Sequence, residues 1–83
     1  VLITGGGSGL GRLLCVQFAK EGARVVTVDL RQNLLDETTA VVEKEAGQRI
    51  ATYLCDLGNR PMIYEVAAKI KAEVGKVDVL VNN

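Results

Sequence analysis

The residues of this chain that could bind a charged ligand begin with a glycine-rich stretch near its start. The stretch, residues 4–12, follows the aliphatic run Val1-Leu2-Ile3, which is typical of a strand. After it come apolar residues at helical spacing, at positions 10, 13, 14 and 18. A turn between a strand and a helix directs free backbone N–H groups and the positive end of a helix dipole to one point. The stretch therefore predicts a site for an anion, of which phosphate is the usual example.

Two common nucleotide-binding motifs do not fit these glycines. The G-x-G-x-x-G fingerprint needs a glycine at its sixth position, which is Leu10 when counted from Gly5 and Arg12 when counted from Gly7. The phosphate loop of nucleotide triphosphatases needs a lysine followed by serine or threonine, where this chain has Arg12-Leu13. Both motifs are therefore excluded.

The pattern that fits is T-G-x-x-x-G-x-G, with glycines at positions 5, 9 and 11. We expect Gly5 to make the tight turn, Gly9 to let a ligand approach the backbone, and Gly11 to let the helix pack closely on the strand. The other loop residues of the predicted site are Gly7, Ser8 and Leu10. The Ser8 hydroxyl either contacts the phosphate or only helps to form the turn, and a plain flexible turn is the alternative for the whole stretch.

An acid at the end of the second expected strand, Arg24–Val28, indicates which nucleotide binds. Asp29 comes eighteen residues after Gly11, where a carboxylate can accept both hydroxyls of an adenosine ribose. It would repel a 2′-phosphate, so NAD(H) is favoured over NADP(H). Arg31 could partly offset that charge and admit a phosphate, and the alternative for Asp29 is an ordinary solvated loop acid.

Further polar residues follow the third and fourth expected strands. Asp56 either accepts a hydrogen bond from an adenine amino group, with Leu57 against the ring, or forms a turn with its own backbone. The amides of Asn82 and Asn83 either bridge neighbouring strands or contact the ribose. Bridging is favoured for Asn82, and Asn83 is assigned to the cofactor site. Arg12 could reach a phosphate, but we expect an exposed surface residue.

These residues are positioned by an alternation of strands and helices. The expected strands are 1–4, 24–28, 49–55 and 77–81, and the expected helices are 10–20, 33 or 36 to 46, and about 61–74. This order predicts an α/β fold, a Rossmann-type doubly wound parallel sheet with strand order 3-2-1-4. The glycine loop and the polar residues then meet outside the carboxyl ends of the strands, where the strand order reverses and ligands bind.

A cap is also predicted for the second helix, and buried faces are predicted for the second and third helices. Asn33 or Asp36 is expected to cap the second helix. Its buried face is expected to contain Leu34, Thr38, Val41 and Val42. The third helix is expected to bury Ile63, Val66, Ala67, Ile70 and Val74. Its exposed face is expected to carry paired charges at Glu65, Lys69 and Glu73.

Composition narrows the range of functions. The chain has 83 residues, 48% of them apolar, which indicates one small folded domain or part of one. Ten acidic and ten basic residues are interspersed, so nothing points to nucleic acid as a partner. No apolar run approaches the ~20 residues needed to cross a bilayer. Because the chain has two cysteines, Cys15 and Cys55, and no histidine, we expect buried thiols, no metal site and an intracellular, reducing environment.

Taken together, the motifs resemble the short-chain dehydrogenase/reductase family. The resemblance rests on residues 4–11, Asp29, Cys55-Asp56-Leu57 and residues 77–83, which end like the start of that family's N-N-A-G motif. The first helix is more narrowly similar to the retinol dehydrogenase and 17β-hydroxysteroid dehydrogenase 11/13-like branch. The resemblance implies an NAD(P)-dependent oxidoreductase of alcohols and carbonyls, including lipid-like ones, and a homo-oligomer.

The family's catalytic residues have no counterpart in this chain. Its Y-x-x-x-K motif is absent, because Leu57 and Ala68 stand four residues after Tyr53 and Tyr64. Residues 1–83 are therefore expected to be the amino-terminal dinucleotide-binding part, with no catalytic residue. For a complete protein the resemblance implies hydride transfer at nicotinamide C4 with a tyrosine as proton donor.

Two expectations remain open at the level of the sequence. The protein is expected to be cytoplasmic, or membrane-associated through segments outside these residues. A non-catalytic nucleotide-binding or regulatory module on the same scaffold is the alternative to an enzyme. The T-G-x-x-x-G-x-G spacing argues against a methyltransferase or a flavoprotein on a similar sheet.

Overall fold

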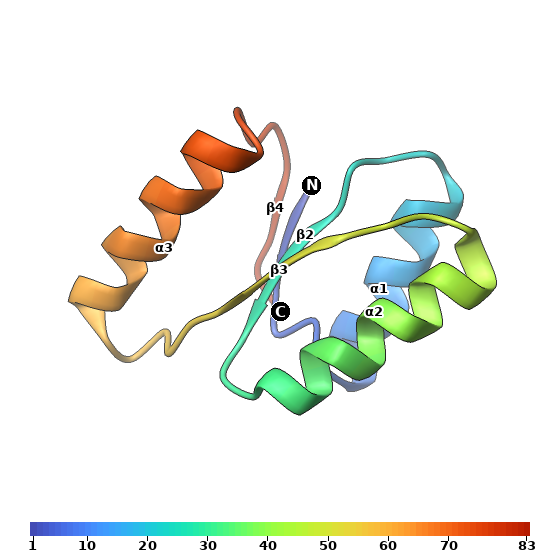
Figure 1. Cartoon of the computed structure of the whole chain (residues 1–83), viewed down its shortest axis with the longest axis horizontal. Helices are drawn as coiled ribbons and strands as arrows, with labels where there is room; N and C mark the ends of the chain where they lie inside the picture. The colour runs from blue at the N-terminus through green and yellow to red at the C-terminus, as the bar shows by residue number, and fades with distance from the viewer.

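Four runs of β-branched and aliphatic residues form one parallel sheet in the computed structural model, which describes residues 1–83 (Figure 1). The strands are β1 (Leu2–Thr4), β2 (Val26–Asp29), β3 (Ala51–Leu54) and β4 (Leu80–Val81). The helices that connect them are α1 (Gly9–Lys20), α2 (Gln32–Ala46) and α3 (Arg60–Glu73). The sheet order is β3-β2-β1-β4, which confirms the predicted doubly wound arrangement.

Helices cover both faces of the sheet. α1 and α2 pack together on one face, whereas α3 lies on the other (Figure 1). The core under α1 and α2 includes Ile3 and Val25. The core under α3 includes Val26, Val28 and Ile70. Val25, just before β2, and Val26, its first residue, therefore face opposite helical layers, which is why this segment is almost uniformly apolar.

The strands are shorter than the sequence pattern indicated. β2 begins at Val26 rather than at residue 24, β3 begins at Ala51 rather than at residue 49, and β4 contains only Leu80 and Val81. The register explains these bounds, because the central strand β1 has three residues and pairs Leu2 with both Val26 and Leu80. Residues that lie beyond the end of β1 have no partner on the central strand.

Two of the apolar residues that are spaced helically in α1 are not buried. Leu10 and Leu13 are 61% and 54% exposed. The helix instead buries Gly11, Cys15, Val16 and Ala19. Small side chains at positions 11, 15 and 19 recur every fourth residue on one face, so α1 can lie close to the sheet. Apolar spacing alone could not distinguish this face from the neighbouring leucine face.

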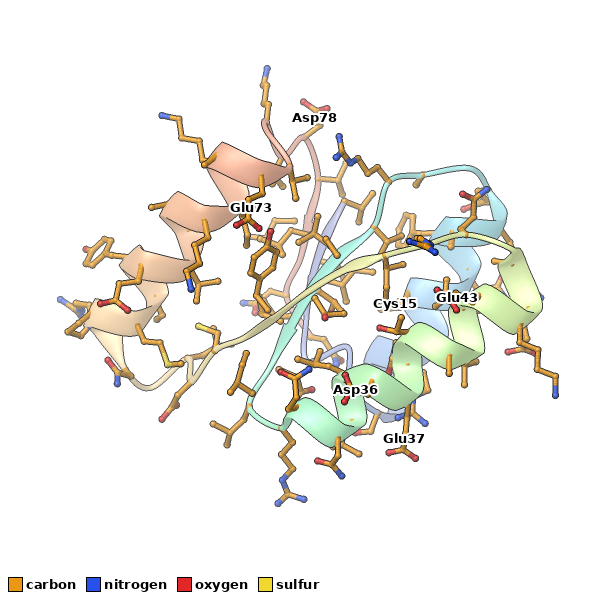
Figure 2. All side chains as sticks on the ribbon, in the orientation of Figure 1. Cys15, Asp36, Glu37, Glu43, Glu73 and Asp78 are labelled. Carbon is orange, nitrogen blue, oxygen red and sulfur yellow. The ribbon has the colours of Figure 1, made fainter.

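The predicted cap of α2 is wrong. Arg31 occupies the capping position without a side-chain cap, and both Asn33 and Asp36 lie inside the helix. Asp36 accepts a hydrogen bond from the Gln32 side chain at 2.9 Å, one turn earlier on the helix surface (Figure 2). The buried residues are Leu35, Thr38 and Val42, whereas Leu34 and Val41 are half-buried. The helix ends at Gly47, which has a left-handed φ of 65°.

α3 begins with a side-chain cap that the sequence analysis did not assign. The side-chain Oδ1 of Asn59 accepts from the Met62 N–H at 3.1 Å, and Pro61 lies in the first turn of the helix. Val66 and Ile70 are buried, as predicted. Ile63 and Val74 are half-buried, and Ala67 is exposed, which differs from the prediction.

The predicted charge pairs on α3 do not form. The ion pairs of the chain are Arg12–Glu37 and Lys76–Asp78, each at 3.9 Å. Glu73 instead accepts a hydrogen bond from the Tyr53 hydroxyl at 2.7 Å, which joins α3 to β3 (Figure 2). This hydrogen bond raises the pKa of Tyr53 above its usual value of 10.0.

Both cysteines are buried and unpaired, as predicted. Burial raises the pKa of the Cys15 thiol and of the Cys55 thiol, so both are held in the protonated form at neutral pH. None of the three helices combines the length and the apolar character that a membrane span needs.

The observed face of α1 leads to a matched pair of substitutions. Val16→Ala should lower the free energy of unfolding by about 2 kcal/mol, because it removes methyl groups from a closely packed core. Leu13→Ala, one turn earlier on the exposed side, should change it by no more than ~0.5 kcal/mol. Urea unfolding of both variants measures the difference, and equal losses would contradict the observed helix orientation.

The Tyr53–Glu73 hydrogen bond makes stability depend on alkaline pH. Because folding raises the Tyr53 pKa, the contribution is complete below about pH 10 and is lost as pH rises through the higher folded-state pKa. Tyr53→Phe should therefore lower the melting temperature at pH 8, and this deficit should shrink above pH 10. The buried thiols titrate in both proteins and cancel in the comparison. A deficit that grows with pH would contradict the assigned sign.

Candidate functional site

The glycine loop folds back on the end of β2. The Gly5 and Gly6 N–H groups both donate to the Val28 carbonyl oxygen, at 2.9 and 3.4 Å. Gly5 has a φ of +68°, in the left-handed region, so its predicted role in a tight turn is confirmed at the level of the backbone. A Cβ on Gly6 would overlap the Thr27 hydroxyl, which lies directly beneath the loop. The loop therefore depends on close approach of the backbone to β2.

The start of α1 presents backbone donors without protein partners. The N–H groups of Ser8, Gly9 and Leu10 donate to no protein acceptor, and the Ser8 side chain does not cap the helix. All three residues are exposed. Gly9 has a φ of +56°, and no atom lies within 4 Å of where its Cβ would be. Such unpaired amides at a helix start, beside open space, form an anion-binding geometry.

Asp29 is fixed against this loop. Its Oδ2 accepts from the Gly7 N–H at 2.9 Å. Its Oδ1 accepts from the N–H groups of Leu30 and Arg31, at 2.7 and 3.3 Å. Asp29 is half-buried and makes no ion pair with Arg31, so it differs from a solvated loop acid. Its carboxylate still has free lone-pair directions for a ligand hydroxyl.

The Gly7 N–H donates to Asp29, so Gly7 differs from Ser8, Gly9 and Leu10, whose N–H groups are unpaired. A Cβ at Gly7 would lie 2.6 Å from Asp29 Oδ2 and 2.8 Å from Leu34 Cβ. The absence of a side chain at Gly7 thus allows the carboxylate to reach the backbone. Gly11 is similar, since a Cβ there would overlap the Gly5 carbonyl oxygen and separate α1 from the loop.

A pocket of about 300 Å³ joins the loop to the ends of β2 and β3. Its lining contains four of the predicted site residues, Gly5, Asp29, Asp56 and Leu57. Asp56 Oδ1 accepts from the Gly58 N–H at 2.8 Å, so the turn-forming alternative for this residue is correct for one carboxylate oxygen. Leu57 is 52% exposed on the pocket wall, with apolar surface available to a flat ring.

The two carboxyl-terminal asparagines lie beside the same loop. Asn82 Oδ1 lies 3.1 Å from the Thr4 hydroxyl, so Asn82 bridges β4 to β1, as favoured from the sequence. The Asn83 N–H donates to the Thr4 hydroxyl at 2.9 Å, and its side-chain amide donates to the Gly5 carbonyl at 3.2 Å. Asn83 thus supports the tight turn, and its Oδ1 makes no hydrogen bond within the chain.

Arg12 is not the surface residue expected from the sequence. Its Nη2 donates to the Gly7 carbonyl oxygen, and its Nε donates to the Thr38 hydroxyl at 2.9 Å. The side chain is 27% exposed. Thr38 in turn donates to the Gly6 carbonyl oxygen at 2.7 Å. Sequence reasoning missed these connections, although a threonine on the apolar face of α2 could have indicated a buried hydroxyl with a partner.

A larger hollow, of about 500 Å³, lies apart from these residues. It is lined by Leu2, Ala67, Ile70, Lys71, Gly75, Lys76 and Val77. This hollow contains no carboxylate, hydroxyl or carboxamide side chain. The smaller pocket is therefore the better candidate site, because polar groups from separate stretches of the chain converge there.

Known proteins are similar to the chain over its whole length. The family model described as short chain dehydrogenase matches residues 1–83. The chain is 47% identical to mouse epidermal retinol dehydrogenase 2 and 46% identical to human estradiol 17-beta-dehydrogenase 11, over 100% of this chain and 27% of each relative. The chain thus spans about a quarter of the length of these curated relatives.

A solved structure shares the fold of the whole chain. A metagenomic short-chain oxidoreductase in complex with NADP superposes with a TM-score of 0.92 at 30% identity. The match covers 100% of this chain and 37% of that one.

The different positions of Gly9 and Gly11 predict different effects of alanine. Gly9→Ala adds a methyl group to open space and strains a left-handed backbone, so it should cost about 1 kcal/mol of stability. The same methyl group should weaken the binding of a phosphate-bearing nucleotide at least tenfold. Gly11→Ala should cost about 3 kcal/mol, because its Cβ meets backbone. Thermal unfolding and NADH fluorescence titration measure the two effects, and similar stability losses would contradict this distinction.

Proposed function

The chain belongs to the short-chain dehydrogenase family, and from this we propose that the complete protein is an NAD-dependent oxidoreductase whose dinucleotide is held by these residues. The observation that carries the proposal is the set of unpaired N–H groups on Ser8, Gly9 and Leu10 beside the anchored Asp29 carboxylate. A pyrophosphate has the charge for the first group, and a ribose has the hydroxyls for the second.

The remaining predicted residues have places in the same proposal. Adenine would occupy the pocket between Asp29 and Asp56, with Leu57 against the ring and the free Asp56 oxygen available to the amino group. Asn83 would contact the ribose nearest the nicotinamide through its free Oδ1. Gly5, Gly7 and Gly11 would contribute by keeping the backbone close to β2 and α1.

NAD is proposed over NADP on the basis of charge. The fixed Asp29 carboxylate would lie where NADP carries its 2′-phosphate, and two anions at that distance repel. Arg31 makes no ion pair with Asp29, so no cation in the chain is held in place to neutralise it. The structural neighbour in complex with NADP shows that membership of the family does not by itself decide between the two cofactors.

The proposed reaction is hydride transfer between nicotinamide and an alcohol or carbonyl compound. This chain binds and orients the dinucleotide, and we assign it no acid–base residue. The names of the relatives, retinol dehydrogenase and estradiol dehydrogenase, support a lipid-like alcohol as substrate. A homo-oligomer, in the cytoplasm or attached to a membrane, completes the proposal.

Initial rates with the complete protein test this function. NAD⁺ or NADP⁺ would be supplied with a panel of alcohols that includes retinol, steroid alcohols and short-chain alcohols, and NAD(P)H formation would be followed by absorbance. Turnover with NAD⁺ and a lipid-like alcohol is the expected result. Tight NADH binding without turnover of any substrate would indicate a non-catalytic module instead.

Asp29→Asn tests the choice of cofactor with little change of shape. Asparagine keeps one oxygen for the Gly7 N–H but removes the negative charge. The preference for NAD over NADP, measured as the ratio of kcat/KM values, should fall by about tenfold or more, mainly through better use of NADP. The matched control Asp36→Asn, on the exposed side of α2, should leave the ratio unchanged. An unchanged ratio in Asp29→Asn would remove Asp29 from the selectivity assignment.

A further inference from the structure

We propose that Arg12, together with Thr38, is a positioning residue that aims the backbone donors of the glycine loop. The proposed role in dinucleotide binding rests on the function above, whereas the effect on the loop itself does not. The side chain of Arg12 comes from the first turn of α1 and reaches across to α2, with the glycine loop between them.

The contacts of Arg12 are all directed to the loop and to α2. Nη2 donates to the Gly7 carbonyl oxygen and approaches the Leu34 carbonyl oxygen at 3.4 Å. Nε donates to the Thr38 hydroxyl, which itself donates to the Gly6 carbonyl oxygen. Two consecutive loop carbonyls are therefore held on the α2 side by one connected network.

Because the peptide unit is planar, these contacts to carbonyl groups fix the direction of the N–H groups that follow them. In a trans peptide the C=O and the following N–H lie in one plane and point in opposite directions, and the chain has no cis peptide. The Gly6 carbonyl shares its plane with the Gly7 N–H, so Thr38 directs that N–H towards Asp29 Oδ2. The Gly7 carbonyl shares its plane with the Ser8 N–H, so Arg12 holds that unpaired donor pointing away from the Arg12 side chain, in the orientation that we propose for binding the pyrophosphate.

Arginine suits this position because its planar guanidinium can donate in two directions at once. A lysine has one ammonium group and cannot reach the Gly7 carbonyl and the Thr38 hydroxyl with the same geometry. The neighbouring Glu37 has little part in the network. It lies 3.9 Å from Arg12 with a side chain that is 58% exposed on the surface of α2 (Figure 2).

The first test uses the complete protein without cofactor. Arg12→Lys and Thr38→Val would be compared with the control Glu37→Gln by amide hydrogen exchange across Gly5–Leu10. Hydrogen exchange of the Gly7 N–H, which is hydrogen-bonded to Asp29, should become at least tenfold faster in both loop variants and stay unchanged in the control. Unchanged exchange in both loop variants would overturn the proposal, whether or not the protein binds a nucleotide.

The second test distinguishes three roles of Arg12: orienting the backbone N–H donors, supplying positive charge, and maintaining the overall structure. In Arg12→Lys the affinities for NADH and ADP-ribose, both of which contain a pyrophosphate, should fall roughly tenfold. The inhibition constant of adenosine, which has no phosphate, and kcat at saturating NAD⁺ should stay within twofold of wild type. Thr38→Val should show the same pattern, and Thr38→Ser, which keeps the hydroxyl, should recover most of the affinity.

Three outcomes would overturn the role in binding. Wild-type affinity in Arg12→Lys would mean that charge alone suffices. An equal loss of affinity for adenosine and for NADH in both loop variants would mean that the substitutions damage the structure generally, and not that they disturb the orientation of the backbone N–H donors. Absence of dinucleotide binding by the wild-type protein would overturn the proposed function as well, and the exchange measurement would then show separately whether Arg12 and Thr38 orient the loop.

Discussion

The hydrogen bond from the Gly7 N–H to the Asp29 carboxylate links the two halves of the candidate site. One partner belongs to the loop that opens α1, and the other ends β2. Because Asp29 also accepts from the backbone that follows it, the carboxylate has little freedom to rotate away. The unpaired amides and the acid that we propose to bind the pyrophosphate and the ribose are thereby held at a fixed separation, as the recognition of one long, flexible ligand at two points would require.

This link is made possible by the absence of side chains where the backbone comes close to its neighbours. Gly7 leaves room for the carboxylate, and Gly11 leaves room for the Gly5 carbonyl. Gly9 has a different role, since no protein atom would obstruct a side chain there. Of these three glycines, Gly9 and Gly11 belong to the pattern T-G-x-x-x-G-x-G, one beside open space and one in close packing, whereas Gly7 stands at one of its variable positions.

Much of the fold could be predicted from the sequence because strand and helix periodicities alternate without interruption. The strand order and the convergence of Asp29, Asp56 and the glycine loop followed from that alternation. Details that depend on partners distant in sequence could not be predicted. The buried face of α1 is set by contact with the sheet, and α2 has no side-chain cap although Asn33 or Asp36 was predicted to supply one. Arg12 looked like a surface residue, because nothing near it in sequence reveals Thr38 of α2 as its partner.

The contact between Gly6 and Thr27 restricts how the sequence of this site can evolve. Thr27 is fully buried, its hydroxyl donates to the Ile3 carbonyl oxygen at 2.6 Å, and it fills the space that a Gly6 side chain would need. A larger residue at position 6 therefore needs a residue without this hydroxyl at position 27, which would leave the Ile3 carbonyl without that donor, and a shift of the Cys15 sulfur, which would lie 3.0 Å from the new Cβ. The two positions are epistatic: each substitution is harmful alone, and a lineage would have to cross a less stable intermediate to change both.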